Sequence, residues 1–302
     1  MDMKEIQAID FWVGPMYYNG ELAREYFKYY EFQIMAVSTF AGVAKKLGIK
    51  PGEEWKVLGG LSKASPEEMV AEMDEIGVEH AIIVAAKVWS WHDQTLMMDT
   101  NIEDIADICK KTSGKVMGAA GYNPLRIKES LEDIDRAVKE YDFKHVWAHP
   151  ISFGMKPNDR RMYPLYAKCS ELGVPVGMQV GHSAEPLPSE EGHPMYADHV
   201  AIDFPELTII LTHTGWPWID EWQSMLWRHP NVYGGINAYY PSSLDPGLVR
   251  FMDSPRGRDK VLWGSHGFGM TRCKKELLEL PIKDETKRKV LRENAIKAFK
   301  LA

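Results

Sequence analysis

Four histidines in this chain could carry acid/base chemistry, because each follows a short apolar run that is typical of a strand. Imidazole titrates near neutral pH, so a histidine can take up a proton and return it. If the strands are parallel, their carboxyl ends meet at one end of the sheet, and several histidines there favour catalysis over a purely structural role. The four are His149, His182, His213 and His266.

Other side chains at the same strand ends could bind a substrate. Amides and hydroxyls could hold a carboxylate or phenol oxygen, Lys87 would add a positive charge, and indole rings would provide flat apolar walls. We predict His213 and His266 as the catalytic pair. The predicted substrate-binding residues are Trp12, Lys87, Tyr122, His149, Gln179, His182, Asn237 and Tyr239. Trp89, Trp91 and Trp147 could join these walls or simply pack within the fold.

The elements that must position these residues form a repeating pattern. Short apolar runs alternate with stretches of helical periodicity, which is typical of βα units and a parallel sheet. The predicted strands span residues 6–13, 80–87, 116–122, 145–149, 174–180, 208–213, 232–236 and 261–265. Eight such units predict an α/β fold, a (β/α)8 TIM barrel formed by residues 1–302 as one domain. No G-x-G-x-x-G opens a helix, which argues against an open dinucleotide-binding sheet.

Helix signals lie between the predicted strands. Ser65-Pro66-Glu67-Glu68 has the form of a capping box with proline at the first helical position, and Gly77 is a suitable C-terminal stop. Apolar residues recur at helical spacing between these two ends. Similar patterns predict helices over residues 127–141, 163–172 and 219–227.

One connection is much longer than the others. Residues 15–64 separate the first strand from the Ser65 helix, whereas a βα loop usually has about 2 to 6 residues. The segment is rich in aromatic residues and leaves the end of a strand where barrel active sites lie. We expect a helical insertion that forms a lid, a pocket wall or a subunit contact, with a small satellite core as the alternative.

Composition limits the partners. A net charge of -7 opposes binding to nucleic acid, whose affinity depends on clustered Lys and Arg. The first ten residues lack the apolar segment of a signal peptide, and no run of about 18 apolar residues occurs. We therefore expect a cytoplasmic homo-oligomer that binds a small molecule and neither nucleic acid nor membrane. The three cysteines are far apart and suggest neither a disulfide framework nor a thiolate metal site.

Several segments together resemble a known family. They are Thr212-His213-Thr214-Gly215 with Pro217-Trp218, His229-Pro230-Asn231-Val232-Tyr233, Gly173-Val174-Pro175-Val176 and Val261-Leu262-Trp263-Gly264-Ser265. In order and spacing they are similar to the amidohydrolase-related (amidohydrolase 2) family, which includes aminocarboxymuconate-semialdehyde decarboxylase, resorcylate-type decarboxylases and C–C bond hydrolases. The resemblance runs from the first to the last predicted strand and implies the barrel. It also implies a catalytic role for His213.

The chain departs from this family where the family binds a divalent metal. Members usually carry D-x-H-x-H on strand one, whereas Asp10 is followed here by Trp12 and Gly14 at the two histidine positions. Gln179 stands at the strand-five histidine and His266 at the strand-eight aspartate. The resemblance therefore implies loss of the inherited metal site, and we expect no metal and no cofactor. The alternative is zinc or another divalent metal in a relocated site of His213, His266 and His149 or His182.

Two reactions fit a histidine pair that works without a metal. A histidine could protonate a carbon of a hydroxyaromatic or enoic acid as carbon dioxide leaves. It could instead activate water to cleave a C–C, C–N or ester bond beside a carbonyl. We therefore expect an enzyme acting on a small cyclic or aromatic carboxylate or carbonyl compound. A barrel kept only as an inactive ligand-binding scaffold is the contrasting hypothesis.

Overall fold

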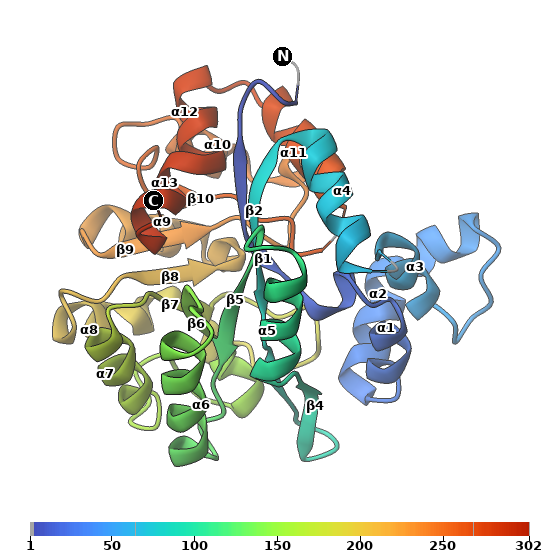
Figure 1. The fold of residues 1–302 in the computed structure, drawn as a ribbon, viewed down its shortest axis with the longest axis horizontal. Helices are drawn as coiled ribbons and strands as arrows, with labels where there is room; N and C mark the ends of the chain where they lie inside the picture. Colours follow the sequence, from blue (N-terminus) through green and yellow to red (C-terminus); the bar gives the residue numbers. More distant parts are fainter. Residues whose placement is uncertain (1–2, 64, 268, 302) are drawn as a thin grey trace.

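A computed structural model describes residues 3–63, 65–267 and 269–301, and their centre is an eight-stranded parallel sheet. The sheet order is β1-β2-β5-β6-β7-β8-β9-β10 (Figure 1). The strands are β1 (Ala8–Val13), β2 (Val78–Val84), β5 (Val116–Gly121), β6 (His145–Ala148), β7 (Val176–Gln179), β8 (Ile209–Thr212), β9 (Val232–Gly235) and β10 (Val261–Leu262). A parallel bridge between Val13 and His266 brings the two outer strands together and nearly closes the sheet. The predicted TIM barrel is confirmed.

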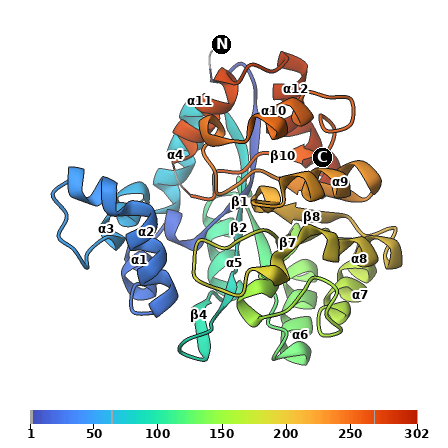
Figure 2. The same ribbon diagram turned by 180° about the vertical axis from the view of Figure 1, so that it is seen from behind.

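Helices surround the barrel (Figures 1 and 2). They are α4 (Pro66–Ile76), α5 (Ile102–Lys111), α6 (Ile127–Lys139), α7 (Tyr163–Leu172), α8 (Ala197–Asp203), α9 (Ile219–Arg228), α10 (Pro246–Met252), α11 (Met270–Glu279), α12 (Asp284–Arg288) and α13 (Asn294–Phe299). The Ser65 side chain accepts a hydrogen bond from the Glu68 N–H, and Gly77 ends α4 in the left-handed conformation. These are the start and stop that the sequence predicted for this helix.

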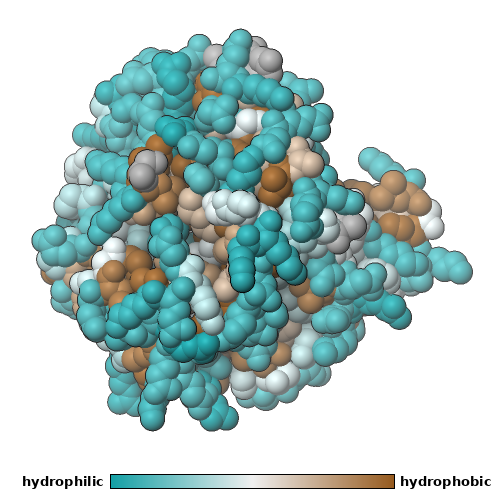
Figure 3. All heavy atoms as spheres, viewed as in Figure 1, coloured by the Kyte–Doolittle hydropathy of each residue, from teal (hydrophilic) through white to brown (hydrophobic). Residues whose placement is uncertain are grey.

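The long connection after β1 folds into helices. It contains η1 (Pro15–Tyr17), α1 (Glu21–Tyr26), α2 (Tyr30–Lys46) and α3 (Trp55–Leu61), which project from the barrel as an arm in both ribbon views (Figures 1 and 2). Apolar residues remain exposed along α2, and brown spheres are visible on the arm in Figure 3. The exposed large apolar side chains are Tyr30, Ile34, Val37 and Val43 of α2 and Leu47, which follows its last residue. The predicted inserted aromatic-rich helical segment is therefore present.

A short hairpin follows β2 where the sequence suggested a longer strand. β2 ends at Val84, and Lys87 begins β3 (Lys87–Ser90), which pairs antiparallel with β4 (Thr95–Asp99). Lys87 Nζ donates to Asp99 across this hairpin at 2.5 Å. Lys87 therefore belongs to the hairpin and not to the end of a barrel strand.

No helix in the described parts of the chain is long and apolar enough to cross a membrane.

Candidate active site

A cavity of about 410 Å³ opens at the carboxyl end of the barrel strands. The barrel supplies the indole rings of Trp12 and Trp147, and the arm supplies Phe32 and Met35, so the walls are mainly apolar. The lining residues are Trp12, Met16, Phe32, Met35, Thr39, Phe40, Leu58, Ala86, Val88, Met98, Trp147, His149, Gln179, His182, Ser183, Ala184, Glu185, His213, Trp216, Ala238, Tyr239 and His266. All four strand-end histidines singled out from the sequence line this one cavity.

His213 follows β8 and is buried, and a hydrogen-bond chain fixes its tautomer. The Thr212 hydroxyl donates to the Met178 carbonyl at 3.0 Å, so its oxygen accepts from His213 Nδ1 at 2.8 Å. A hydroxyl has only one proton to donate, so the proton of this imidazole must lie on Nδ1. Nε2 therefore keeps its lone pair. Burial and the neighbouring imidazoles of His266 and His149 lower the pKa of His213 well below its usual range.

The imidazole of His266 contacts that of His213. The centroids of the two imidazoles are 4.9 Å apart, and the rings meet edge to face. The indole of Trp12 stacks on His266 with centroids 4.1 Å apart. Burial lowers the pKa of His266 to about 3, so the ring is neutral at pH 7.

His149 has the opposite tautomer from His213. Its Nδ1 accepts a hydrogen bond from the Ser152 backbone N–H at 3.2 Å, so the proton of the neutral ring lies on Nε2. Burial lowers the pKa of His149 to about 4. At neutral pH the cavity thus contains one histidine with a bare Nε2 and another that can donate from Nε2.

Asp10 holds two strand ends together behind this site. Its carboxylate accepts from the Trp12 N–H at 3.3 Å and from the Ser265 N–H at 3.0 Å. These bonds connect the end of β1 to the turn that carries His266. Complete burial raises the pKa of Asp10 to about 7, because desolvation disfavours the carboxylate.

Backbone strain is concentrated at the same end of the barrel. His213, Ala238 and His266 line the cavity and have positive φ angles of 70°, 73° and 60°. Thr214, next to His213, has a φ of 60°. Non-glycine residues rarely adopt this conformation, which costs on the order of 1 kcal/mol or more for each and is often found at functional sites.

The predicted substrate-binding residues divide into two groups. Trp12, His149, Gln179, His182 and Tyr239 line the cavity. Lys87, Tyr122 and Asn237 are not among its lining residues.

The three residues outside the cavity have structural partners. Lys87 is paired with Asp99, and the hydroxyl of the buried Tyr122 donates to the Arg161 carbonyl at 2.6 Å. Asn237 is fully buried, and its carbonyl oxygen accepts from the His213 N–H at 3.3 Å. Asn237 therefore supports the turn at His213 from behind, whereas Lys87 and Tyr122 lie elsewhere. Among the proposed aromatic walls, Trp147 lines the cavity, but Trp89 and Trp91 do not.

Sequence reasoning missed several lining residues. Glu185 and Trp216 lie in loops that follow β7 and β8. Loop residues have no strand or helix periodicity, so the direction of these side chains could not be predicted from the sequence. Glu185 is half-buried, and its carboxylate accepts from the Ser183 hydroxyl. Burial and the charge of Glu31 raise its pKa. Pro186 and Pro188 in this loop are typical of irregular chain and do not indicate where its side chains point.

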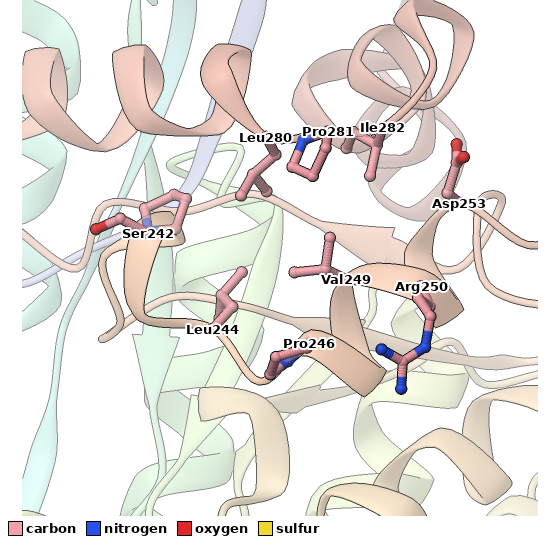
Figure 4. Close-up of a pocket in the computed structure, with 10 residues that line it drawn as sticks. Ser242, Leu244, Pro246, Val249, Arg250, Asp253, Leu280, Pro281 and Ile282 are labelled. Atoms are coloured by element: carbon pink, nitrogen blue, oxygen red, sulfur yellow. The ribbon is translucent and has the colours of Figure 1, made fainter.

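A second cavity, of about 440 Å³, lies on the outer layer of the barrel (Figure 4). It is formed by α10, the turn before it and the connection between α11 and α12, with Leu244, Val249 and Ile282 among its walls. It contains none of the residues predicted from the strand ends. The candidate active site is therefore the cavity at the carboxyl end.

The fold and the cluster of histidines at the strand ends define a barrel of the amidohydrolase type. The family model described as Amidohydrolase (Amidohydro_2) matches residues 37–301, and the chain belongs to this family. No curated protein matches the sequence.

Solved structures share the fold over nearly the whole chain. An uncharacterized TIM-barrel protein from Bordetella bronchiseptica is 24% identical with a TM-score of 0.72, covering 98% of this chain and 99% of that one. A 5-carboxyvanillate decarboxylase from Novosphingobium aromaticivorans is 16% identical (TM-score 0.69, covering 99% and 98%). A dihydroxybenzoic acid decarboxylase from a Polaromonas species is also 16% identical (TM-score 0.65, covering 98% and 97%).

The expectation of no cofactor is contradicted by structures that share this fold. Both decarboxylase structures contain bound manganese. The residues of this chain do not fit such an ion: within residues 3–63, 65–267 and 269–301, no group of three or more His, Cys, Asp or Glu side chains could hold a metal. The relocated three-histidine site therefore lacks support as well. Trp12, at a position where the resemblance implies a ligand, stacks on His266 instead.

Proposed function

We propose that this chain is an amidohydrolase-family enzyme that acts on a small cyclic or aromatic compound, with His213 and His266 as its acid/base pair. The observation that carries the proposal is the contact between the two imidazoles, with centroids 4.9 Å apart, in an apolar cavity of about 410 Å³. A cavity of this size suits a single substituted ring. The strained turns at both histidines support a functional role.

The tautomers of His213 and His149 suggest different roles for the two residues in a hydrolytic reaction. His213 Nε2 is bare and can take a proton from water while the water oxygen bonds to a carbonyl carbon of the substrate. His149 Nε2–H can donate to the carbonyl oxygen as it gains negative charge. When the C–C, C–N or ester bond beside that carbon breaks, a histidine returns the proton to the departing atom. The products are a carboxylic acid and the protonated leaving group.

His266 is suited to the second half of this sequence. It meets His213 edge to face, so a proton taken up by His213 has another imidazole beside it. Stacking against Trp12 restricts rotation of the His266 ring, which lines the cavity. We assign the return of the proton to His266 on this basis.

Decarboxylation is the second candidate, favoured by the two decarboxylases with similar structures. In that reaction a histidine protonates the ring carbon and the carboxylate leaves as carbon dioxide. It requires a substrate carboxylate in the cavity. The two reactions differ in products, since hydrolysis consumes water and forms an acid, whereas decarboxylation releases carbon dioxide.

The proposal is tested by a product screen with purified protein. Cyclic 1,3-diketones, aromatic esters and hydroxybenzoates are incubated with the protein, with and without added manganese, and products are identified by mass spectrometry. We expect turnover that falls by about 100-fold or more in both His213→Asn and His266→Asn, the usual size of a lost general acid or base. Turnover that persists in both variants would overturn the assignment of the pair.

A further inference from the structure

The charges around the cavity restrict what it can bind. None of the described residues that line it is Lys or Arg, and burial lowers the pKa of three of its four histidines. A neutral imidazole offers a hydrogen bond but no positive charge. A substrate carboxylate buried here would therefore have no fixed cation beside it, and burial of an unpaired charge is costly.

The positively charged residue predicted to bind a substrate carboxylate is instead paired with an acidic side chain of the chain itself. Lys87 pairs with Asp99 across the β3–β4 hairpin, and it does not line the cavity. Its side chain is largely covered, with 17% of its surface exposed. Moving it to the cavity would break this ion pair.

An acidic side chain, and not a basic one, lines the cavity. Glu185 lines the wall beside His182 and Ser183, and the Ser183 hydroxyl fixes its carboxylate. A second carboxylate, that of the buried Glu31 at the start of α2, lies near enough to raise the pKa of Glu185. Glu31 is itself held by the Ser90 hydroxyl at 2.8 Å and the His92 N–H at 2.6 Å. Both acidic groups are fixed in place.

We propose that this cavity takes an uncharged ring compound bearing a hydroxyl or enol group, and that Glu185 is the residue that excludes the corresponding carboxylate. The inference deepens the proposed function, on which it rests, by naming the substrate class of the same site. A hydroxyl or enol can donate to Glu185, while the aromatic walls cover the ring. A ring carboxylate beside Glu185 would meet a like charge or force Glu185 to take up a proton, and no lysine or arginine among the described lining residues would offset this cost. Between the two reactions above, this favours cleavage beside a carbonyl.

Binding of two matched probes tests this inference. Resorcinol and 2,6-dihydroxybenzoate have the same dihydroxylated ring and differ only in the carboxylate. Isothermal titration calorimetry gives the Kd of each for the full chain, for Glu185→Gln and for the control Glu190→Gln. Glu190 begins a short 3-10 helix (Glu190–Gly192) in the same connection between β7 and α8, but it is exposed and does not line the cavity.

We expect the full chain to bind resorcinol at least 10-fold more tightly than 2,6-dihydroxybenzoate. Glu185→Gln should reduce this ratio to threefold or less, chiefly through tighter binding of 2,6-dihydroxybenzoate, whereas Glu190→Gln should keep the 10-fold preference. Equal or tighter binding of 2,6-dihydroxybenzoate by the full chain would overturn the inference. So would an unchanged ratio in Glu185→Gln, or a lack of binding by both probes.

This test is separate from the test of catalysis. Calorimetry measures binding without turnover, so the same Kd ratio is expected in His213→Asn. If that variant keeps the ratio and also keeps full turnover, the histidine assignment fails and the specificity inference stands. If it loses turnover while the full chain prefers 2,6-dihydroxybenzoate, the reverse holds.

Discussion

The barrel has a buried histidine at each end, but only the histidine at the carboxyl end faces a cavity and has a defined tautomer. His213 follows β8 at the carboxyl end, and His145 begins β6 at the amino end. Burial lowers the pKa of both, that of His145 to about 3. His213 faces a cavity and has its Nδ1 proton fixed by Thr212, whereas both ring nitrogens of His145 lack a partner among the described residues. A perturbed pKa therefore does not identify a functional residue without a cavity and a fixed tautomer.

Cations show the same contrast. At the amino end, the fully buried Lys274 donates to the carbonyls of Ile6, Ile76 and Gly77 at 2.6 to 2.9 Å. It ties the start of β1 to the end of α4. At the carboxyl end, none of the described residues lining the cavity is a lysine or arginine. The buried cation at the amino end stabilises the fold, whereas polar side chains at the carboxyl end face the cavity.

The largest expected effect is on stability at the amino end. Lys274→Met leaves three buried carbonyls without their donor, so we expect the free energy of unfolding to fall by about 4 kcal/mol. Urea unfolding measures this change, and turnover per folded molecule should remain within about twofold because the residue is far from the cavity in the fold. The exposed Lys275→Met serves as the control and should change stability by less than about 0.5 kcal/mol. Equal effects of the two substitutions would contradict the role of Lys274.

A smaller effect, on catalysis alone, is expected at Thr212. Thr212→Val removes the oxygen that accepts from His213 Nδ1, so the imidazole can adopt the unproductive tautomer. We expect kcat to fall about 50-fold, equivalent to about 2.3 kcal/mol, with little change in KM. Thr212→Ser restores the hydroxyl and should recover most of the activity. A serine variant as slow as the valine variant would show that packing, and not the hydrogen bond, is what matters.

The amino-end histidine should affect the pH dependence of stability. The pKa of His145 is lowered from 6.5 to about 3 in the folded chain, so between these values the unfolded chain binds more protons. Its contribution to stability is present above pH 6.5 and is lost as the pH falls. At pH 5 the loss is about 2 kcal/mol relative to pH 8.

His145→Gln should therefore lose about 2 kcal/mol less than the unmodified chain between pH 8 and pH 5, as measured by urea unfolding at both values. His199→Gln, which replaces an exposed histidine, should behave like the unmodified chain. An unchanged pH dependence in His145→Gln would mean that the ring is already charged or solvated in the folded state.

The smallest effect is expected on the arm. Met35 of α2 lines the cavity, while the neighbouring Ile34 is exposed on the same helix. Met35→Ala should raise KM about fivefold, or about 1 kcal/mol, with kcat nearly unchanged, because it removes apolar contact with the ring. Ile34→Ala should leave KM unchanged. If only Ile34→Ala alters the kinetics, and does so in a concentration-dependent way, the arm acts as a subunit contact instead of a pocket wall.

Much of the barrel could be predicted because its strands are buried apolar runs with polar residues at their ends. β8, for example, is Ile209-Ile210-Leu211-Thr212, and His213 follows at once. The error at Lys87 arose because the run from His80 continues into a second apolar stretch. The chain bends at Ala85 and Ala86 and enters a hairpin, and only pairing with β4 reveals this.

The cavity was less predictable than the strands. Strand ends fix the positions of His149, Gln179, His213 and His266, so spacing was enough to nominate them. Glu185 lies in a loop, and the arm residues reach the cavity because their helices pack against the barrel. Neither arrangement produces a periodic sequence pattern from which it could be predicted. The expectation of no cofactor failed for a different reason, since it inferred an absence from missing ligands while structures of the same fold contain manganese.

The most direct test of the account is the protonation state of His213. Nitrogen-15 NMR of histidine-labelled protein distinguishes the two neutral tautomers from the imidazolium, and the His213→Asn variant assigns the signal. We predict a ring that is neutral at pH 7, with its proton on Nδ1 and an unprotonated Nε2. A proton on Nε2, or an imidazolium at pH 7, would contradict it.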